Sequence, residues 1–244
     1  MIDCVITLKK IIDKLYQQQV DVQLTRPDPK FGDFATNAAL QLAKPLGKNP
    51  REIAEAIAEM LARHRPPFVV FDPVMAASTH KRLMNESDLE RIRTVLLPQV
   101  SLLTPNLKEA ARLLGIAQPV DEAGMRACLP ALQALGVPNV LLKGGHLADD
   151  TPDAPESTDL LATPEGVIRL SAPRIATRHG HGTGCTLSSA IAALWPQHGL
   201  EKATRMAKDY VHGALLHADA LQVGHGRGPL HHFWQAVHLP GQLA

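Results

Sequence analysis

Cysteine, net charge and long apolar runs are all scarce in this 244-residue chain. Its three cysteines, Cys4, Cys128 and Cys185, are widely spaced without a CxxC pair, which argues against a disulfide framework and favours a reducing compartment. A formal net charge of only +1 gives no global field that favours a polyanionic partner. No apolar run reaches membrane-spanning length, and the first residues interrupt their apolar pattern with charges, unlike a signal peptide. We therefore expect a cytoplasmic globular protein without a membrane partner.

The chain changes texture near residues 61–66. Residues 1–61 have the pattern of a helix, a turn-rich middle and a second helix. From residue 68 onward, short apolar runs alternate with helical stretches, and segments 68–73, 100–106 and 139–145 have the pattern of buried parallel strands. The acidic, proline-containing stretch 148–159 is typical of a surface loop. This alternation predicts an α/β fold with a mostly parallel sheet flanked by helices.

A glycine-rich turn, RHGHGTGC at residues 178–185, precedes a run with helical spacing that extends to about Leu194. Its alternate glycines, Gly180, Gly182 and Gly184, permit backbone angles that aim successive amides at one point. The helix N-terminus after them also favours negative charge. The turn is neither a Walker A loop nor a dinucleotide fingerprint, because no Gly-Lys-Ser/Thr closes it and Cys185 replaces the last glycine. It predicts another kind of phosphate site, with simple chain reversal as the alternative.

Polar residues follow the three predicted strands: Asp72 the first, Asn106 and Glu109 the second, and Lys143 the third. Ligands of α/β sheets bind beyond the carboxyl ends of the strands. Carboxylates for Mg²⁺, a lysine for phosphate oxygens and amides for developing charge are what phosphoryl transfer requires. Taken singly, Asp72 can merely start a turn at Pro73, and Glu109 can be a first-turn helix charge.

Five segments that occur in order resemble the hydroxymethylpyrimidine/phosphomethylpyrimidine kinases of the ribokinase-like superfamily, over roughly residues 66–235. They are FDPVM, LLTPNLKEAARLLG, VLLKGGH, APRIATRHGHGTGCTLSSAIAA and VGHGRGPLHHF. The resemblance implies a phosphotransferase of thiamine biosynthesis that uses ATP and Mg²⁺ to phosphorylate a small pyrimidine substrate. It also implies that the GTGC turn is the anion hole, with Cys185 where most ribokinase-like kinases have a catalytic aspartate.

The resemblance further implies a set of site residues. Lys143 matches the strand-end lysine of the family, and Asn106 with Glu109 matches its N-x-x-E motif, which is associated with Mg²⁺ and phosphate. The expected catalytic residues are Cys185, Lys143, Gly182 and Gly184; the expected cofactor-binding residues are Asn106, Glu109, Thr183 and Gly226; the expected metal ligands are Asp72 and Glu109. The position of Cys185 at a helix N-terminus predicts a lowered pKa for its thiol. The alternative is that Cys185 is a small buried apolar residue.

Residues 22–57 resemble a different family, the N-terminal additional domain of arginyl-tRNA synthetases, most recognisably at FGDFATN, residues 31–37. In synthetases this domain contacts tRNA, which makes Phe34 and Asn37 candidate contacts, but HIGH and KMSK signatures are absent and exclude aminoacylation. The glycine-rich opening and first strands of the kinase family are missing. The chain therefore resembles a chimera of a small α+β domain at 1–62 and an incomplete ribokinase-like sheet at 66–240. The alternative function is a tRNA-binding module fused to an inert kinase remnant.

The join between these parts carries its own expectations. Pro66 and Pro67 should end the preceding helix by about His64. A sheet without its first strands exposes an apolar edge, which either the N-terminal helices or a partner chain should cover. We expect apolar residues of the first domain, Ile53, Ile57 and Leu61 among them, to pack on that edge; the other outcome is a homo-oligomer.

Overall fold

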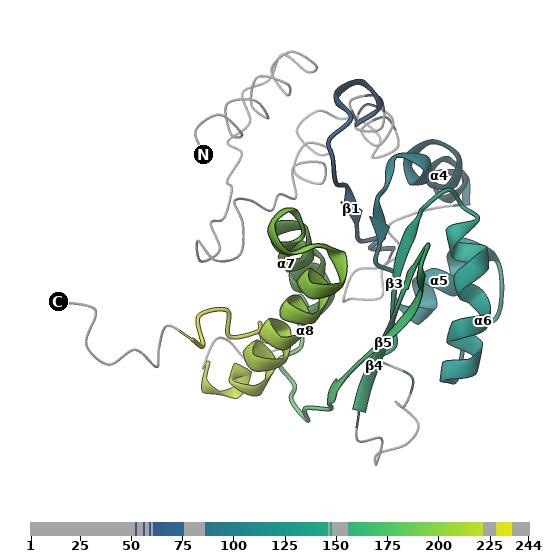
Figure 1. Ribbon diagram of the computed structural model, residues 1–244. Coiled ribbons are helices and arrows are strands. Elements are labelled where there is room, and N and C mark those ends of the chain that lie inside the picture. Colours follow the sequence, from purple (N-terminus) through teal and green to yellow (C-terminus); the bar gives the residue numbers. More distant parts are fainter. Residues whose placement is uncertain are drawn as a thin grey trace.

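The computed structural model describes residues 61–75, 86–145, 147, 156–221 and 228–235, together with Glu52, Ala56 and Glu59 (Figure 1). Its sheet has five strands in the order β1-β2-β3-β4-β5, which is also their order in the chain. They are β1 (Val70–Phe71), β2 (Leu102–Leu103), β3 (Asn139–Lys143), β4 (Glu156–Thr163) and β5 (Gly166–Pro173). β1, β2 and β3 are parallel, whereas β4 is antiparallel to both β3 and β5.

The sheet is therefore mixed, and the expectation of a mostly parallel sheet is wrong. β4 and β5 form a hairpin in which Thr163 pairs with Gly166 across a two-residue turn, and two antiparallel strands need no crossover helix. The expected loop at 148–159 is also wrong over its last four residues, because β4 begins at Glu156. Thr158 and Asp159 are buried there. Such polar residues resemble a loop in sequence, but in the sheet they have hydrogen-bond partners.

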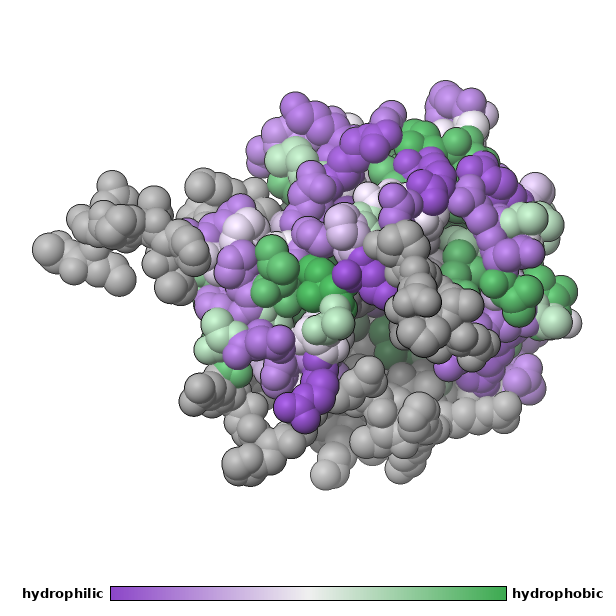
Figure 2. Space-filling view, turned by 90° about the horizontal axis from the view of Figure 1, so that it is seen from below, coloured by the Kyte–Doolittle hydropathy of each residue, from purple (hydrophilic) through white to green (hydrophobic). Residues whose placement is uncertain are grey.

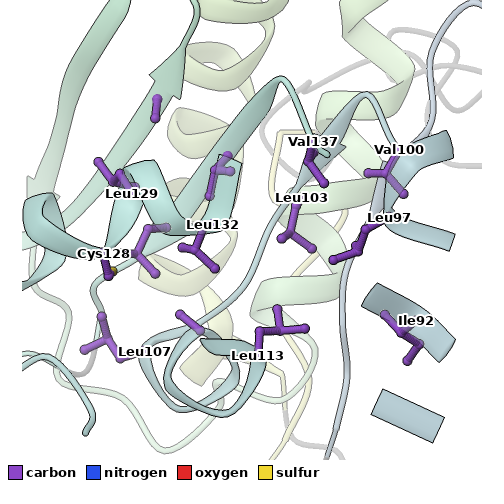
Figure 3. Packing of buried hydrophobic residues seen from close by; sticks show 14 of the residues in the cluster. Ile92, Leu97, Val100, Leu103, Leu107, Leu113, Cys128, Leu129, Leu132 and Val137 are labelled. Carbon is purple, nitrogen blue, oxygen red and sulfur yellow. The ribbon is translucent and has the colours of Figure 1, made fainter. Parts of the chain in front are cut away.

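Helices cover both faces of the sheet (Figure 1). One face carries α4 (Glu86–Arg91) with the short turns that follow it, α5 (Leu107–Leu114) and α6 (Glu122–Gln133); the other carries α7 (Thr183–His198) and α8 (Leu200–Leu216). Neighbouring residues of a strand alternate between the two cores: Leu103 and Leu142 join the core on the α5–α6 face (Figure 3), and Leu102 and Leu141 join the core on the α7–α8 face. These strands are apolar on both faces because both faces are covered.

The expected helix after the glycine-rich turn is confirmed as α7, which runs four residues beyond Leu194 to His198. The helix before the join is also confirmed to end at His64, and the Arg65 amide still donates to the Leu61 carbonyl over 2.8 Å. Leu61 packs against the core of the α5–α6 face, whereas Ile53 and Ile57 lie outside the described residues. No helix in the described part of the chain is long and apolar enough to cross a membrane.

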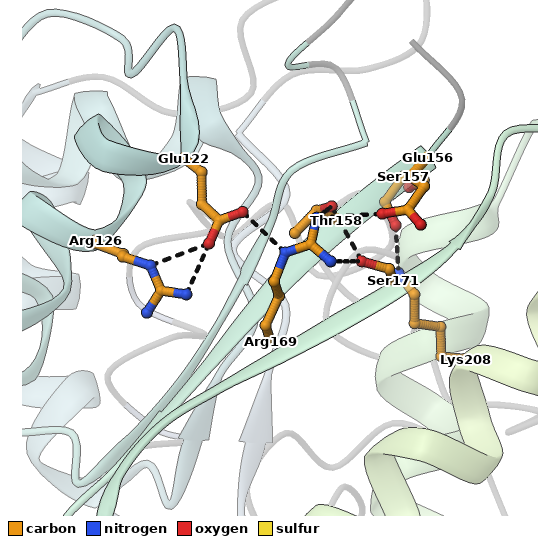
Figure 4. Close-up of polar contacts among 8 residues, drawn as sticks. All are labelled: Glu122, Arg126, Glu156, Ser157, Thr158, Arg169, Ser171 and Lys208. Carbon is orange, nitrogen blue, oxygen red and sulfur yellow. Dashed lines mark hydrogen bonds and ion pairs between the residues drawn. The ribbon is translucent and has the colours of Figure 1, made fainter.

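Polar contacts fasten the β4–β5 hairpin to helices on both faces (Figure 4). Arg169 of β5 donates to Glu122 of α6 and to Glu156 of β4. On the other face, Lys208 of α8 lies 2.6 Å from the Asp159 carboxylate, and both side chains are almost completely buried. The second oxygen of Asp159 accepts the Gly144 amide at 2.9 Å. The buried ion pair therefore also holds the loop that follows β3.

Removing one charge of this pair should be costly. Lys208→Met leaves Asp159 buried without its cation, so we expect a loss of about 3–5 kcal/mol in the free energy of unfolding, measured by urea denaturation. Adding Asp159→Asn to Lys208→Met should recover much of that loss, because no uncompensated charge then remains. Lys202→Met, at an exposed position of the same helix, is the control and should cost less than about 0.5 kcal/mol. Equal effects of the two single substitutions would contradict the prediction.

Candidate active site

The carboxyl ends of β1 and β3 bring an aspartate and a lysine into contact. Lys143 is the last residue of β3, and Asp72 follows the end of β1. Lys143 Nζ lies 2.8 Å from Asp72 Oδ1, and each side chain is only 14% exposed. Parallel strands end at the same edge of a sheet, which is why two residues 71 positions apart meet. The face of the molecule seen in Figure 2 has hydrophilic side chains among apolar ones.

The glycine-rich turn lies directly against this ion pair. A Cβ atom on Gly184 would lie 2.9 Å from Lys143 Nζ, so any larger residue here would push the lysine ammonium out of its present position. Gly182, the residue before α7, has a left-handed φ of 87°, which glycine adopts without strain. Thr183 secures the turn by donating its hydroxyl to the Gly180 carbonyl at 2.8 Å. The N-terminal turn of α7 therefore lies beside the Lys143 ammonium. The first N–H groups of this turn have no partner within the helix.

Two buried hydroxyl groups link the turn to Asp72. Ser188 Oγ donates to the Gly184 carbonyl at 2.9 Å and lies 2.9 Å from Thr104 Oγ1. Thr104, which is fully buried, lies 3.4 Å from Asp72 Oδ1. Sequence reasoning missed both residues, because a threonine before a proline and a serine in a small-residue helix have many ordinary explanations.

Asn106 and Glu109 form the N-terminal cap of α5, next to Lys143. Asn106 Oδ1 accepts the Glu109 amide at 2.9 Å, and Glu109 Oε2 accepts the Asn106 amide at 2.8 Å. The structural alternative for Glu109, a first-turn helix charge, is thus confirmed as one of its roles. Burial raises the pKa of the Glu109 carboxyl, and Asp72 adds to this, whereas the Asn106 amide and the Lys143 ammonium oppose it. The carboxylate therefore lies within the electrostatic reach of the Lys143–Asp72 pair.

Cys185 lies in the first turn of α7, as expected, but the expected lowering of its pKa is wrong. Partial burial of the thiol raises the pKa most, followed by the negative charge of Asp72 and a hydrogen bond with it; Glu109 adds a smaller effect, against the opposing Lys143 ammonium. The helix N-terminus alone would favour the thiolate. Burial, together with the nearby carboxylates, outweighs it, and the pKa of Cys185 rises above its usual value, which favours the thiol at neutral pH.

Two carboxylates beside one lysine suit an ion carried by a phosphate ligand. In the described part of the chain, no group of three or more His, Cys, Asp or Glu residues could hold a metal ion by itself. Mg²⁺ commonly takes only one or two protein carboxylates and completes its shell with water and phosphate oxygens. Asp72 and Glu109, the expected metal ligands, fit that pattern.

Some expected residues cannot be placed. Gly226 lies outside the described residues, as do Phe34 and Asn37. The described residues begin again at Gly228, whose amide donates to His179 Nδ1 at 3.0 Å. This contact joins the C-terminal segment to the start of the glycine-rich turn.

Comparisons with known proteins point to the same kinase family. The family model "Phosphomethylpyrimidine kinase" matches residues 49–231, and "Arginyl tRNA synthetase N terminal domain" matches residues 6–77. The hydroxymethylpyrimidine/phosphomethylpyrimidine kinase of Salmonella typhimurium is 49% identical over 225 residues, which cover 91% of this chain and 80% of that protein. The Escherichia coli enzyme of the same name is 48% identical with the same coverage.

Solved structures agree with this similarity. Pyridoxal kinase from Bacillus subtilis, in an ADP complex, has a TM-score of 0.67 and 26% identity, covering 77% of this chain and 67% of that one. Phosphomethylpyrimidine kinase from Clostridium difficile has a TM-score of 0.55 and 30% identity, covering 67% of this chain and 64% of that one. The described α/β sheet thus has kinases as its structural neighbours.

The raised pKa of Cys185 can be tested by alkylation with iodoacetamide. Burial raises the pKa most and stays in place, but Asp72→Asn removes the charge that adds to it, so the thiolate fraction at neutral pH should rise by about tenfold for each unit by which the pKa falls. Mass spectrometry of the Cys185 peptide should show correspondingly faster modification. The buried Cys128 in the same digest is the control and should not change its rate. An unchanged or slower rate at Cys185 in Asp72→Asn would contradict this account.

Proposed function

The chain belongs to the phosphomethylpyrimidine kinase family, and we propose that it transfers a phosphoryl group from ATP to hydroxymethylpyrimidine and to its monophosphate in thiamine biosynthesis. The observation that carries the proposal is the Lys143–Asp72 pair, set against the glycine that opens α7. A cation lies there beside the N-terminus of a helix, and both stabilise charge on a transferred phosphoryl group. Direct assay of ADP formation with each pyrimidine tests the proposal.

The residues of the chain divide this work. Lys143 neutralises charge on the phosphoryl oxygens. To do so, its ammonium leaves the Asp72 carboxylate and binds the phosphoryl group. The amides of the GTGC turn, residues 182–185, hold the same oxygens as charge develops. Asp72 and Glu109 would hold Mg²⁺ through carboxylate oxygens, and Asn106 and Thr183 keep α5 and the turn in place around the nucleotide. Mg²⁺ held by these carboxylates would supply positive charge against the phosphates of the nucleotide.

Cys185 is the group that takes up the proton of the attacking hydroxyl. Because its pKa is raised, only a small thiolate fraction exists at neutral pH, and that fraction grows as the pH increases. Turnover should therefore increase on the alkaline side of neutrality. Asp72 adds to the raised pKa, and Lys143 opposes it.

Cys185→Ala tests this role. A general base contributes about 10²- to 10⁴-fold, so kcat should fall by that factor. Nucleotide affinity, measured by calorimetry, should stay within about twofold, because the thiol acts mainly in the transition state. Ser189→Ala, at an exposed position of the same helix, is the control and should leave both quantities unchanged. An unchanged kcat in Cys185→Ala would remove the thiol from the mechanism.

We also propose that residues 1–62 form an added domain and residues 66–240 the kinase portion. The two family matches support two parts, since one covers residues 6–77 and the other residues 49–231, and they overlap over 49–77, the stretch that contains the proposed boundary. Among the described strands, β1 is an edge strand, and Phe68 and Val74 beside it are 40% and 37% exposed. The first domain has a physical reason to cover this edge, because apolar edges promote association.

Deleting residues 1–60 tests whether the added domain covers β1. We expect the remaining chain to become insoluble or oligomeric in sedimentation experiments, because the edge and its apolar residues would be uncovered. A soluble, folded monomer would mean that the two parts are only tethered.

The match of residues 6–77 to a synthetase domain also favours a second candidate function, binding of structured RNA. Full-length protein that binds tRNA in a salt-sensitive manner, without Mg²⁺·ATP stabilisation, would favour this function over the kinase.

A further inference from the structure

Arg174 directly follows β5 and reaches back to the loop after Lys143. Its Nη1 donates to the Gly145 carbonyl at 2.8 Å, two residues beyond Lys143. β5 runs in the same direction as β3, because each is antiparallel to β4. The carboxyl ends of the two strands therefore lie at one edge of the sheet, and Arg174 stands at the edge where the Lys143–Asp72 pair is found. Gly180, the first glycine of the glycine-rich turn, lies six residues further along the chain.

The remaining donors of Arg174 have nothing to bind. Nε and Nη2 are both buried, and neither has a hydrogen-bond partner among the residues that the structure describes. Arg169 in the same strand shows the contrast, since it is exposed and donates to two carboxylates. A buried donor of a charged group without a partner is costly, so a native structure that keeps one calls for an explanation.

The two free donors are adjacent on the guanidinium plane. Nε–H and the neighbouring Nη2–H point the same way, which is the side-on fork that holds two oxygens of one phosphate or carboxylate. Lys143 cannot supply this geometry, because its ammonium is a point charge and is already paired with Asp72. Arg174 therefore adds a directional cation at this edge.

We propose that Arg174 binds a phosphate group through Nε and Nη2, as a binding residue that the motif comparison did not single out. The proposal rests on the proposed function and deepens it by adding a phosphate ligand to the same site. Two sources share this chemistry: the polyphosphate of the nucleotide, and the monophosphate that a once-phosphorylated pyrimidine brings to the second transfer. Either one places more negative charge at the site than Lys143 can neutralise alone.

Calorimetry on the full chain separates these sources. Arg174→Gln should weaken binding of the phosphate-bearing ligand by about 10- to 100-fold, the loss expected for a charge-assisted hydrogen-bond pair. Binding of unphosphorylated hydroxymethylpyrimidine should not change. A loss confined to ADP and ATP assigns the fork to the nucleotide, and a loss confined to the pyrimidine monophosphate assigns it to the substrate. Arg174→Lys keeps the charge without the fork and should recover only part of the affinity.

The control is Arg205→Gln, because Arg205 is exposed on α8 and already paired with Glu201. It should leave all affinities unchanged. Phosphate affinity and thermal stability together distinguish a ligand residue from a brace: Arg174→Met loses the Gly145 contact in either case, but a residue that only braces Gly145 would lower the unfolding temperature without changing phosphate affinity. That pattern, or wild-type affinity of Arg174→Gln for every phosphate ligand, overturns the proposal. Because binding is read directly, loss of phosphate affinity supports it even if the chain phosphorylates no pyrimidine, and that result would overturn only the proposed function.

Discussion

The pairing of Lys143 with Asp72 is possible only because β1, β2 and β3 run parallel and end at one edge of the sheet. The rest of the site is arranged around this contact. The first turn of α7 approaches Lys143 so closely that a side chain at position 184 would displace the ammonium. The cap of α5 lies on the other side, where the carboxylate of Glu109 is influenced by both charges of the pair. A slip of one residue in β3 would turn Lys143 to the other face of the sheet and separate these groups.

Buried hydroxyl groups make the pair and the turn a single unit. Each hydroxyl has one proton, so when Ser188 donates to the Gly184 carbonyl, Thr104 donates to Ser188. Only the longer contact of 3.4 Å then joins Thr104 to Asp72. Asp72 is accordingly held mainly by Lys143, and the same carboxylate adds to the effect of burial in raising the pKa of the Cys185 thiol.

The β4–β5 hairpin extends the site beyond the parallel strands. Asp159 ties the loop after Lys143 to α8, and Arg169 ties the hairpin to α6. Arg174 then leaves the end of β5 at the same edge as Lys143. The hairpin was not predicted from the sequence, because its polar residues resemble a loop unless their partners on α8 and β3 are known.

Features that depend on neighbours in the chain were determined by the sequence. The alternating glycines, the start of α7, the Asn106–Glu109 cap and the end of a helix at His64 follow from local backbone preferences, and the structure contains each of them. Tertiary structure alone decided the direction of β4 and β5, the protonation of Cys185 and the link between Thr104 and Ser188. It also left two donors of Arg174 without partners. These properties arise from charges and hydrogen bonds between residues far apart in the chain, and their strength depends on burial, which a local pattern does not contain.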